Sequence, residues 1–320
     1  INKKNTFIRT PFSFIGNLFK KYWRSKNIIQ DLIKDEIDIY HGLSNELPIG
    51  IEKTTIKSVV TIHDLIFMRF PNLFNCIDRN IYYKKSKSAC ERADKIIAIS
   101  QQTKKDIIEL LNIPEEKIAV VYQGCNQIFQ RAIPLQKQQD IIRKYHLKKD
   151  YLLYVGTIEK RKNLLTLLAV LKELPKQKLI IIGDGKSYKK KCLEFIIKHQ
   201  LSNRVFFLKG LSPEEIAVVY RSAEIMIYPS IFEGFGIPII EALFSKTPVI
   251  TTKGGCFIEA GGENSQYINP LSVADMKDAI IKIKESSEIR NKMIVKGLEY
   301  AQRFTDDKVA ANLMKVYTDL

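Results

Sequence analysis

The chain has 320 residues, of which 45% are hydrophobic and 27% charged, and its formal net charge at pH 7 is +16. This length can build a large core and indicates two domains rather than one. The five cysteines lie far apart, without a CxxC pair or Cys/His ligand spacing, which argues against a disulfide framework or a structural zinc site and fits a reducing cytosol.

The sequence contains no run of 18 apolar residues and no visible signal peptide. The basic excess attracts polyanions in general: nucleic acid, anionic lipid headgroups or phosphorylated small molecules. No recognisable nucleic-acid module accompanies it, so we expect no nucleic-acid partner. We expect a cytoplasmic protein.

The chain starts with a polar, irregular stretch, and residue 1 is isoleucine rather than methionine. The following segment, FSFIGNLFKKYWRSKNIIQDLIK, can form a helix that places apolar side chains near basic ones: Phe14, Leu18, Phe19 and Trp23. Two interpretations remain open. The favoured one is an amphipathic helix that covers a sheet, and the other is peripheral attachment to the inner, anionic face of the cytoplasmic membrane.

From residue 37 onward, short apolar runs alternate with helical patterns. The expected strands are rich in Val and Ile and apolar on both faces, as buried strands are: 37–42, 58–64, 95–100, 118–124, 151–157, 178–185, 204–210, 224–230 and 247–255. Helices are expected between most of them: 78–93, 101–112, 163–174, 187–200, 213–222, 238–246 and 272–287. This alternation predicts an α/β protein with parallel sheets, which the hydrophilic stretch at 130–149 divides into two Rossmann-like domains.

Glycine and polar residues gather where these strands end. In parallel sheets, ligands bind at the carboxyl ends of strands. We therefore expect a cleft that both sheets line.

The stretch FEGFGIPIIEAL, residues 232–243, combines two glutamates, two glycines and a proline. Pro238 suits a first helical position, and Gly234 and Gly236 allow unusual φ values and a close approach of ligand to backbone. The N–H groups and dipole of such a helix start can hold a phosphate. Glu241, expected in the first turn, can accept hydrogen bonds from the paired hydroxyls of a ribose. The alternative, a glycine turn with a capping acid, explains the whole stretch poorly.

This stretch resembles the E-x7-E signature of retaining glycosyltransferases of family 4, of the "glycosyl transferases group 1" type, which adopt the two-domain GT-B fold. The resemblance runs from about residue 37 to the C-terminus and includes YLLYVGTIEKRKNLLTLLAVL, IIIGDG, TPVITTKGG, YHGLSNELP and VVTIHDLIFMRFP, in the family's order. It implies an acceptor-side domain at 1–148, a donor-binding domain at 149–300 and, at 301–320, a helix that packs back toward the first domain.

The resemblance also implies roles for individual residues. Arg161 and Lys162 match the basic pair that grips the donor diphosphate, and their charge would stabilise the departing nucleoside diphosphate without an obligatory metal or other cofactor. The alternative for EKRKN alone is a charged surface loop. Glu241 matches the ribose-binding glutamate and Glu233 the one that faces the transferred sugar.

Softer assignments follow from the same resemblance. The backbone of three residues would approach the donor sugar and phosphates: Phe235, Gly236 and Ile237. Gly183 and Leu211 match positions near the nucleotide. His63, at a strand end, matches the histidine that lines the sugar site, and His41 is a candidate acceptor contact; both are also compatible with ordinary structural roles.

The implied activity is transfer of a sugar, with mannose favoured, from a GDP- or UDP-sugar to a glycan or lipid-linked acceptor with retention of configuration, in cell-envelope polysaccharide synthesis. Three alternatives remain: a sugar-nucleotide epimerase, a non-catalytic or weakly active sugar-nucleotide-binding fragment, and a nucleic-acid binder that rests on charge alone. The chain departs from the family at its start, where a first strand and a glycine-rich loop are not matched and Gly16 alone does not replace them. We therefore expect a fragment with a less stable first half and weak or absent transfer activity.

Overall fold

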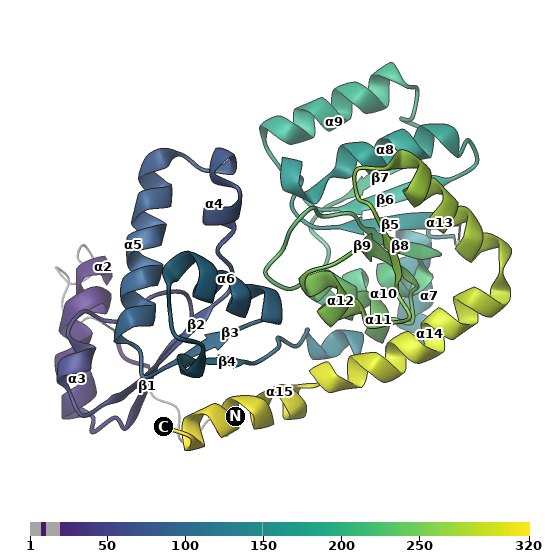
Figure 1. The fold of residues 1–320 in the computed structure, drawn as a ribbon. Helices are drawn as coiled ribbons and strands as arrows, with labels where there is room; N and C mark the ends of the chain where they lie inside the picture. The colour runs from purple at the N-terminus through teal and green to yellow at the C-terminus, as the bar shows by residue number, and fades with distance from the viewer. Residues whose placement is uncertain (1–7, 11–19, 149) are drawn as a thin grey trace. The chain divides into compact units, whose positions relative to one another are not determined.

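The computed structural model describes residues 8–10, 20–148 and 150–320 (Figure 1). Phe14, Leu18 and Phe19 of the expected amphipathic helix, and Gly16, lie outside the described residues. The described part of that segment is helical over α2 (Lys20–Tyr22), the π-helical η2 (Trp23–Asn27) and α3 (Ile28–Lys34). Trp23 donates its indole N–H to Asp31 Oδ2 at 2.9 Å.

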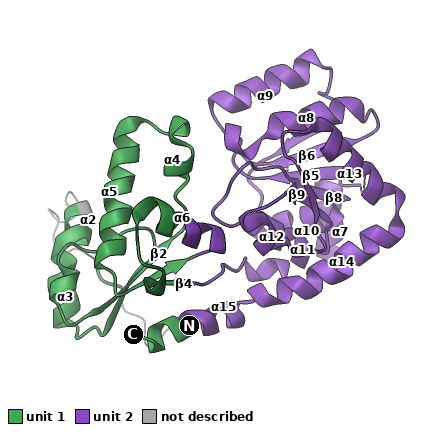
Figure 2. Cartoon of the chain, in the orientation of Figure 1, with its two compact units in different colours: residues 1–98, 106–119, 315–320 green, residues 99–105, 120–314 purple. Residues whose placement is uncertain are grey.

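The chain forms two compact units (Figure 2). Unit 1 comprises residues 1–98, 106–119 and 315–320, and unit 2 comprises 99–105 and 120–314. The expected domain boundaries at 148/149 and 300/301 differ from this division, because 120–148 and 301–314 group with unit 2. Each unit is described by itself.

Unit 1 contains a four-stranded sheet in the order β1-β2-β3-β4, in which β1 and β3 both pair in parallel with β2. Its strands are β1 (Ile39–Gly42), β2 (Lys57–Ile62), β3 (Lys95–Ala98) and β4 (Ile118–Val120). Its helical segments are α4 (Ile66–Arg69), η4 (Pro71–Leu73), α5 (Cys76–Arg92) and most of α6 (Gln101–Leu111), with short turns η3 (Ile51–Lys53) and η5 (Glu115–Lys117). The central strand β2 is buried from Ser58 onward, as its apolar sequence predicts.

The start of α6 groups with unit 2 and makes two sets of hydrogen bonds within it. Ser100 Oγ donates to the carbonyl of Gly234 at 2.6 Å. The carboxylate of Glu259 accepts the backbone N–H groups of Gln101 at 2.7 Å and Gln102 at 3.1 Å. Glu259 thus satisfies two N–H groups that a helix start leaves without an internal acceptor.

Unit 2 is built on a six-stranded sheet in the order β10-β9-β8-β5-β6-β7, and all of its neighbouring pairs are parallel. The strands are β5 (Tyr151–Val155), β6 (Lys178–Ile182), β7 (Val205–Leu208), β8 (Ile225–Tyr228), β9 (Val249–Thr252) and β10 (Gln266–Ile268). The helices are α7 (Leu135–Lys144), α8 (Leu164–Glu173), α9 (Ser187–Lys198), α10 (Pro213–Ser222), α11 (Ile237–Phe244), α12 (Cys256–Gly261), α13 (Val273–Glu285) and α14 (Ser287–Ala301); α15 (Asp306–Thr318) continues into residues assigned to unit 1.

Successive residues of β5 point to opposite faces of this sheet, and each face has its own hydrophobic cluster. Tyr151 and Leu153 belong to the cluster that includes α10 and α11, whereas Leu152 and Tyr154 belong to the one that includes α8 and α13. Strands apolar on both faces are thus buried on both faces, as predicted from their composition.

The nine predicted strands are all present, and the α/β class with two parallel sheets is confirmed. Helices α4, α12 and α14 were not predicted, and neither were helix α7 and strand β10. The hydrophilic stretch 130–149 contains helix α7, which buries Ile141. The low overall hydrophobicity of this stretch predicted a boundary between domains, although its few apolar residues share one helical face. The edge strand β10 (Gln266–Ile268) has a single buried residue, Ile268, and lacks the apolar run that marked the other strands. Among the described residues, no helix is both long and apolar enough to cross a membrane.

Candidate functional site

The predicted donor residues surround the point in unit 2 where the strand order reverses. From β5 the chain proceeds outward through β6 and β7, then returns to the other side of β5 with β8. Loops that leave two such neighbouring strands diverge, and the crevice between them is where open parallel sheets bind ligands. Arg161 and Lys162 follow β5, and Glu233 follows β8.

The basic pair lies in the short 3₁₀ turn η7 (Lys160–Lys162), which ends at Asn163 with a left-handed φ of 57°. Asn tolerates this conformation better than most residues, and here it begins α8. The side chains of Arg161 and Lys162 are each 11% exposed. The turn therefore directs two cations inward rather than toward solvent, which disfavours the surface-loop interpretation of EKRKN.

Glu233 brings both cations together. Its Oε1 lies 2.8 Å from Arg161 Nη1 and 2.6 Å from Lys162 Nζ, and its side chain is 10% exposed. The same oxygen accepts no hydrogen bond of good geometry from any described residue, so charge at close range dominates these contacts. Arg161 also pairs with the more exposed Glu159 at 2.7 Å.

The pKa of Glu233 reflects two opposing effects. Burial alone would raise it, but the charges of Lys162 and Arg161 outweigh burial and lower the pKa below its ordinary value. Burial likewise acts to lower the pKa of Arg161, and the charges of Glu233 and Glu159 raise it. Glu233 is therefore a carboxylate held in its ionised form by the cations beside it.

Tyr228, the last residue of β8, positions Lys162. Its hydroxyl accepts a hydrogen bond from Lys162 Nζ at 2.8 Å, and the same ammonium lies 5.0 Å from the ring centroid. The backbone carbonyl of Arg161 also accepts the N–H of Ile231 at 2.9 Å, which joins the turn after β5 to the loop after β8.

The loop that carries Glu233 is anchored through its backbone carbonyls. Gly234 receives the hydroxyl of Ser100, and Glu233 receives the thiol of Cys256 at 3.2 Å. Of the two glycines, Gly236 has the unusual φ, 137°, whereas Gly234 has no positive φ. The prediction for Gly236 is confirmed and that for Gly234 is wrong, because its carbonyl contacts rather than its φ place it.

The side chain of Phe235 turns away from the backbone and into the core. It is 3% exposed and stacks on Tyr122, with the ring centroids 5.4 Å apart and the planes at 9°. Within the described residues, nothing accepts a hydrogen bond from the backbone N–H groups of Phe235, Gly236 and Ile237. These groups, at the start of α11, are available to an anionic ligand.

Glu241 lies farther along α11 than predicted. The helix begins at Ile237, one residue before Pro238, so the placement of Glu241 in the first turn is wrong and it opens the second. Its Oε2 accepts the hydroxyl hydrogen of Tyr220 at 2.8 Å. Burial raises the pKa of Glu241, and the Tyr220 hydrogen bond opposes that shift without cancelling it.

Gly183 is required by a close crossing of backbones. A Cβ at this position would lie 1.9 Å from the carbonyl oxygen of Gly156, at the end of β5. Leu211 is partly buried against the hydrophobic cluster that includes α10 and α11. The nucleotide contacts expected of Gly183 and Leu211 stay predictions.

Both predicted histidines lie in unit 1. His63 follows β2; its Nε2 is 2.8 Å from the carbonyl oxygen of Leu43, and its backbone N–H donates to Asn45 Oδ1 at 3.2 Å. His41 in β1 has both ring nitrogens engaged, Nδ1 with the Tyr317 hydroxyl at 2.6 Å and Nε2 with the Thr61 hydroxyl at 2.7 Å. Burial lowers the pKa of His41. A sugar or acceptor contact at either residue stays a prediction.

Sequence reasoning missed three residues that support this site: Ser100, Tyr220 and Tyr228. Tyr228 had a detectable signal, because it ends a buried strand two residues before the loop, where a polar hydroxyl needs a partner. Ser100 and Tyr220 had no detectable signal in the sequence, since each forms its hydrogen bond with a residue far away along the chain, Gly234 and Glu241 respectively. In the described part of the chain, no three His, Cys, Asp or Glu side chains group so as to hold a metal ion.

Similar structures and sequences are known. The crystal structure of Anabaena Alr3699/HepE in complex with UDP superposes with a TM-score of 0.76 at 19% identity, covering 92% of this chain and 81% of that one. At this identity the likeness concerns the fold alone, and that fold is GT-B.

Two curated relatives are O-antigen chain mannosyltransferases. One, mannosyltransferase B of Escherichia coli, is 26% identical over 87% of this chain and 74% of its own length. The other, RfbU of Salmonella typhimurium, is 29% identical over 72% of this chain and 61% of its own length, so the matched part is less than two thirds of that protein.

Two family models also match. "Glycosyltransferase Family 4" matches residues 3–127, and "Glycosyl transferases group 1" matches residues 137–300, which is more than half of the chain and includes every residue of the E-x7-E and Arg-Lys motifs. The chain is therefore a glycosyltransferase that belongs to the glycosyl transferases group 1 family.

Proposed function

We propose that this chain is a retaining glycosyltransferase that takes its sugar from a nucleoside diphosphate donor bound in unit 2. The observation that carries the proposal is the convergence of Arg161, Lys162 and Glu233 at the reversal of strand order, next to the N–H groups that begin α11. Two fixed cations and a helix N-terminus are suited to a diphosphate. Glu241, one turn along the same helix, is the acceptor for the ribose hydroxyls.

In this proposal, charge does most of the catalytic work. The guanidinium of Arg161 and the ammonium of Lys162 stabilise the negative charge that develops on the departing nucleoside diphosphate. The role requires no metal ion. Glu233 faces the transferred sugar, and the N–H groups of Phe235, Gly236 and Ile237 hold the sugar phosphate in position.

The sugar we propose is mannose, and the acceptor is a glycan or lipid-linked glycan of the cell envelope. Both assignments are supported by the two O-antigen mannosyltransferase relatives. The structural neighbour was solved in complex with UDP, which supports a nucleotide-sugar donor for this chain, and GDP and UDP are the alternatives to test. We further propose that the protein works in the cytoplasm, attached peripherally to the inner face of the membrane.

Isothermal titration calorimetry with GDP and with UDP tests the donor site. We expect saturable binding of one nucleotide, weakened roughly tenfold or more in Glu241→Gln, since the amide loses a charged acceptor for the ribose hydroxyls. Glu285→Gln, which changes an exposed carboxylate at the end of α13, should leave the affinity unchanged. If neither nucleotide binds a folded sample, the donor site is wrong.

Retention requires a separate measurement. With the preferred mannose nucleotide and a mannoside acceptor, proton NMR of the first product should show the same anomeric configuration as the donor. An inverted product would refute the retaining mechanism and leave the donor site intact.

A further inference from the structure

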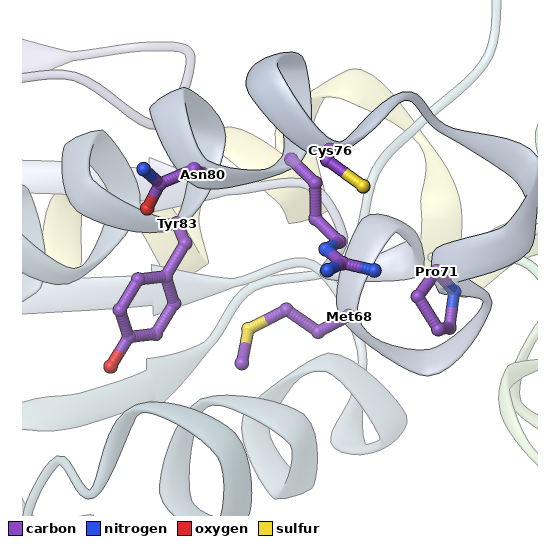
Figure 3. A pocket seen from close by; sticks show the side chains of 6 residues that line it. Met68, Pro71, Cys76, Asn80 and Tyr83 are labelled. Atoms are coloured by element: carbon purple, nitrogen blue, oxygen red, sulfur yellow. The ribbon is translucent and has the colours of Figure 1, made fainter.

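Unit 1 contains a pocket to which no role has yet been assigned. It has a volume of about 490 Å³ and is lined by Met68, Pro71, Cys76, Arg79, Asn80 and Tyr83. Figure 3 shows Cys76, Asn80 and Tyr83 on successive turns of α5, with Met68 and Pro71 coming from α4 and η4. This volume falls within the range of about 300–1,000 Å³ that is usual for small-molecule sites.

The polar side chains of this pocket have no hydrogen-bond or ion-pair partner among the residues that the structure describes. Arg79 is half-buried, yet within the described residues its guanidinium meets no carboxylate and donates no hydrogen bond. The same holds for the Asn80 amide and the Tyr83 hydroxyl; the Tyr83 ring has the Lys87 ammonium 5.8 Å from its centroid. A half-buried guanidinium usually has an anionic partner, because its desolvation is otherwise uncompensated.

The surroundings favour an anion. Cys76 is the first residue of the 17-residue helix α5, so the positive end of that helix dipole faces the pocket. The carboxylate closest in sequence, Asp78, does not line the pocket and receives a hydrogen bond from the Asn75 side chain. The fork of N–H donors on Arg79 suits the oxygens of a phosphate, and the Asn80 amide and the Tyr83 hydroxyl provide donors elsewhere along the pocket wall (Figure 3).

We propose that this pocket binds a phosphate group on the acceptor, with the Arg79 guanidinium as its main partner. The volume exceeds what a phosphate needs, and the walls of Met68, Pro71 and the Tyr83 ring hold the sugar or hydrocarbon attached to it. This inference rests on the proposed transferase function, and it narrows the acceptor to a phosphate ester. The ester is either a soluble sugar phosphate or a lipid-linked phosphate.

Cys76 makes occupancy of the pocket measurable. It is exposed, whereas Cys90, Cys125, Cys192 and Cys256 are buried. Burial raises the pKa of the Cys90, Cys125 and Cys192 thiols to about 12 and that of Cys256 as well, which slows their reaction. The fast phase of reaction with N-ethylmaleimide therefore reports Cys76, and its loss in Cys76→Ser verifies that assignment.

The experiment measures this rate with inorganic phosphate, mannose 1-phosphate, or phosphatidylcholine vesicles with and without polyprenyl phosphate. We expect saturable protection in the unaltered chain. In Arg79→Gln the apparent affinity should fall roughly ten- to a hundredfold, the loss of a charged hydrogen-bond pair. Lys84→Gln, an equal change of charge on an exposed position of α5 outside the pocket, should retain protection.

The outcomes separate cleanly. Protection by mannose 1-phosphate, or only by vesicles that carry polyprenyl phosphate, supports the pocket and identifies the soluble or the lipid-linked source. No protection by any probe, or an equal loss of protection in Arg79→Gln and Lys84→Gln, overturns it.

Tyr83→Phe, which removes only a hydroxyl, gives a second, milder variant if Arg79→Gln proves unstable. Nucleotide calorimetry on the same samples reads unit 2 alone, so failure of the donor site and failure of the pocket remain distinguishable.

Discussion

The two glutamates of the E-x7-E motif have opposite electrostatic roles. Glu233 has a lowered pKa because two cations outweigh its burial, whereas Glu241 has a raised pKa because burial outweighs a single hydroxyl donor. Below the ordinary pKa of a glutamate, the stability that Glu233 contributes is lost as the pH falls. For Glu241 the pH dependence is reversed: its protonated form contributes to stability, and this contribution is lost as the pH rises through the raised pKa.

A prediction for stability follows from the raised pKa of Glu241. At pH 7 its ionised form is disfavoured by burial, and Gln can still accept the Tyr220 hydroxyl. Glu241→Gln should therefore raise the melting temperature by about 2–4 °C for each kcal/mol gained, while it weakens nucleotide binding. Calorimetric melts at pH 7 and at acid pH check this result. The gain should shrink at acid pH, where Glu241 is already protonated, and a variant that melts lower at pH 7 would contradict the assigned pKa shift.

A second prediction concerns Glu233, which in the proposed function competes with the donor diphosphate for Arg161 and Lys162. Glu233→Gln should lower the free energy of unfolding by about 3 kcal/mol, since it leaves the largely buried Lys162 without its anion and Arg161 with only the more exposed Glu159. The same change should raise the affinity for the preferred nucleoside diphosphate roughly three- to tenfold and reduce sugar transfer. Denaturant melts, calorimetry and a transfer assay check the three effects.

The matched control for this variant is Glu159→Gln. Glu159 also pairs with Arg161, but its side chain is 48% exposed, so its charge is screened by water. The loss of stability and the gain in nucleotide affinity should both be much smaller in Glu159→Gln than in Glu233→Gln. Equal effects of the two substitutions would show that general charge, not the buried contact of Glu233, sets nucleotide affinity.

At the scale of elements, the site depends on how closely the loops after β5 and β6 approach one another. The N–H of Gly156 donates to the carbonyl of Ile182 at 3.0 Å, and the N–H of Ile158 donates to that of Asp184 at 2.7 Å. These bonds bring the turn that carries Arg161 and Lys162 close to Gly183. The glycine is thus a structural requirement of the crossing, whatever else it contacts.

Gly183→Ala should destabilise unit 2 by about 3 kcal/mol or more, because the added Cβ overlaps the carbonyl oxygen of Gly156. Gly210→Ala is the matched control. Its φ is 67° and a Cβ there meets nothing within 4 Å, so only the conformational cost of about 1 kcal/mol applies. Urea unfolding of both variants measures the difference, and similar losses would show that the loops relax to accommodate the methyl group.

At the scale of the whole molecule, the net charge of +16 is the property that bears on attachment to a membrane. Each basic residue near an anionic surface contributes about 1 kcal/mol, and the attraction is screened over about 10 Å at 0.1 M salt. We expect the chain to sediment with vesicles rich in phosphatidylserine at low salt, and to dissociate as salt is raised toward about 0.5 M. Vesicles of pure phosphatidylcholine are the control, and equal binding to both would refute electrostatic attachment.

Much of this fold could be predicted because its patterns are local. Runs of Val and Ile apolar on both faces placed nine of the strands, and Pro238 after a glycine-rich loop placed the start of α11 to within one residue. The candidate site residues were also found from local sequence patterns. Arg161 and Lys162 directly precede a predicted helix, and Glu233 directly precedes the glycine-rich turn that starts another. Their roles came from a resemblance to a family, not from spacing alone.

The sequence by itself determined which segments are strands and helices, because burial on one or two faces leaves a mark on neighbouring residues. Only the tertiary structure decided that Glu233 meets Arg161 and Lys162, that Tyr228 and Tyr220 hold Lys162 and Glu241, and that Arg79 lines a pocket. Each of these contacts depends on which strands and helices become neighbours. That choice is made by the packing of the whole sheet and its covering helices, and local propensity carries little information about it.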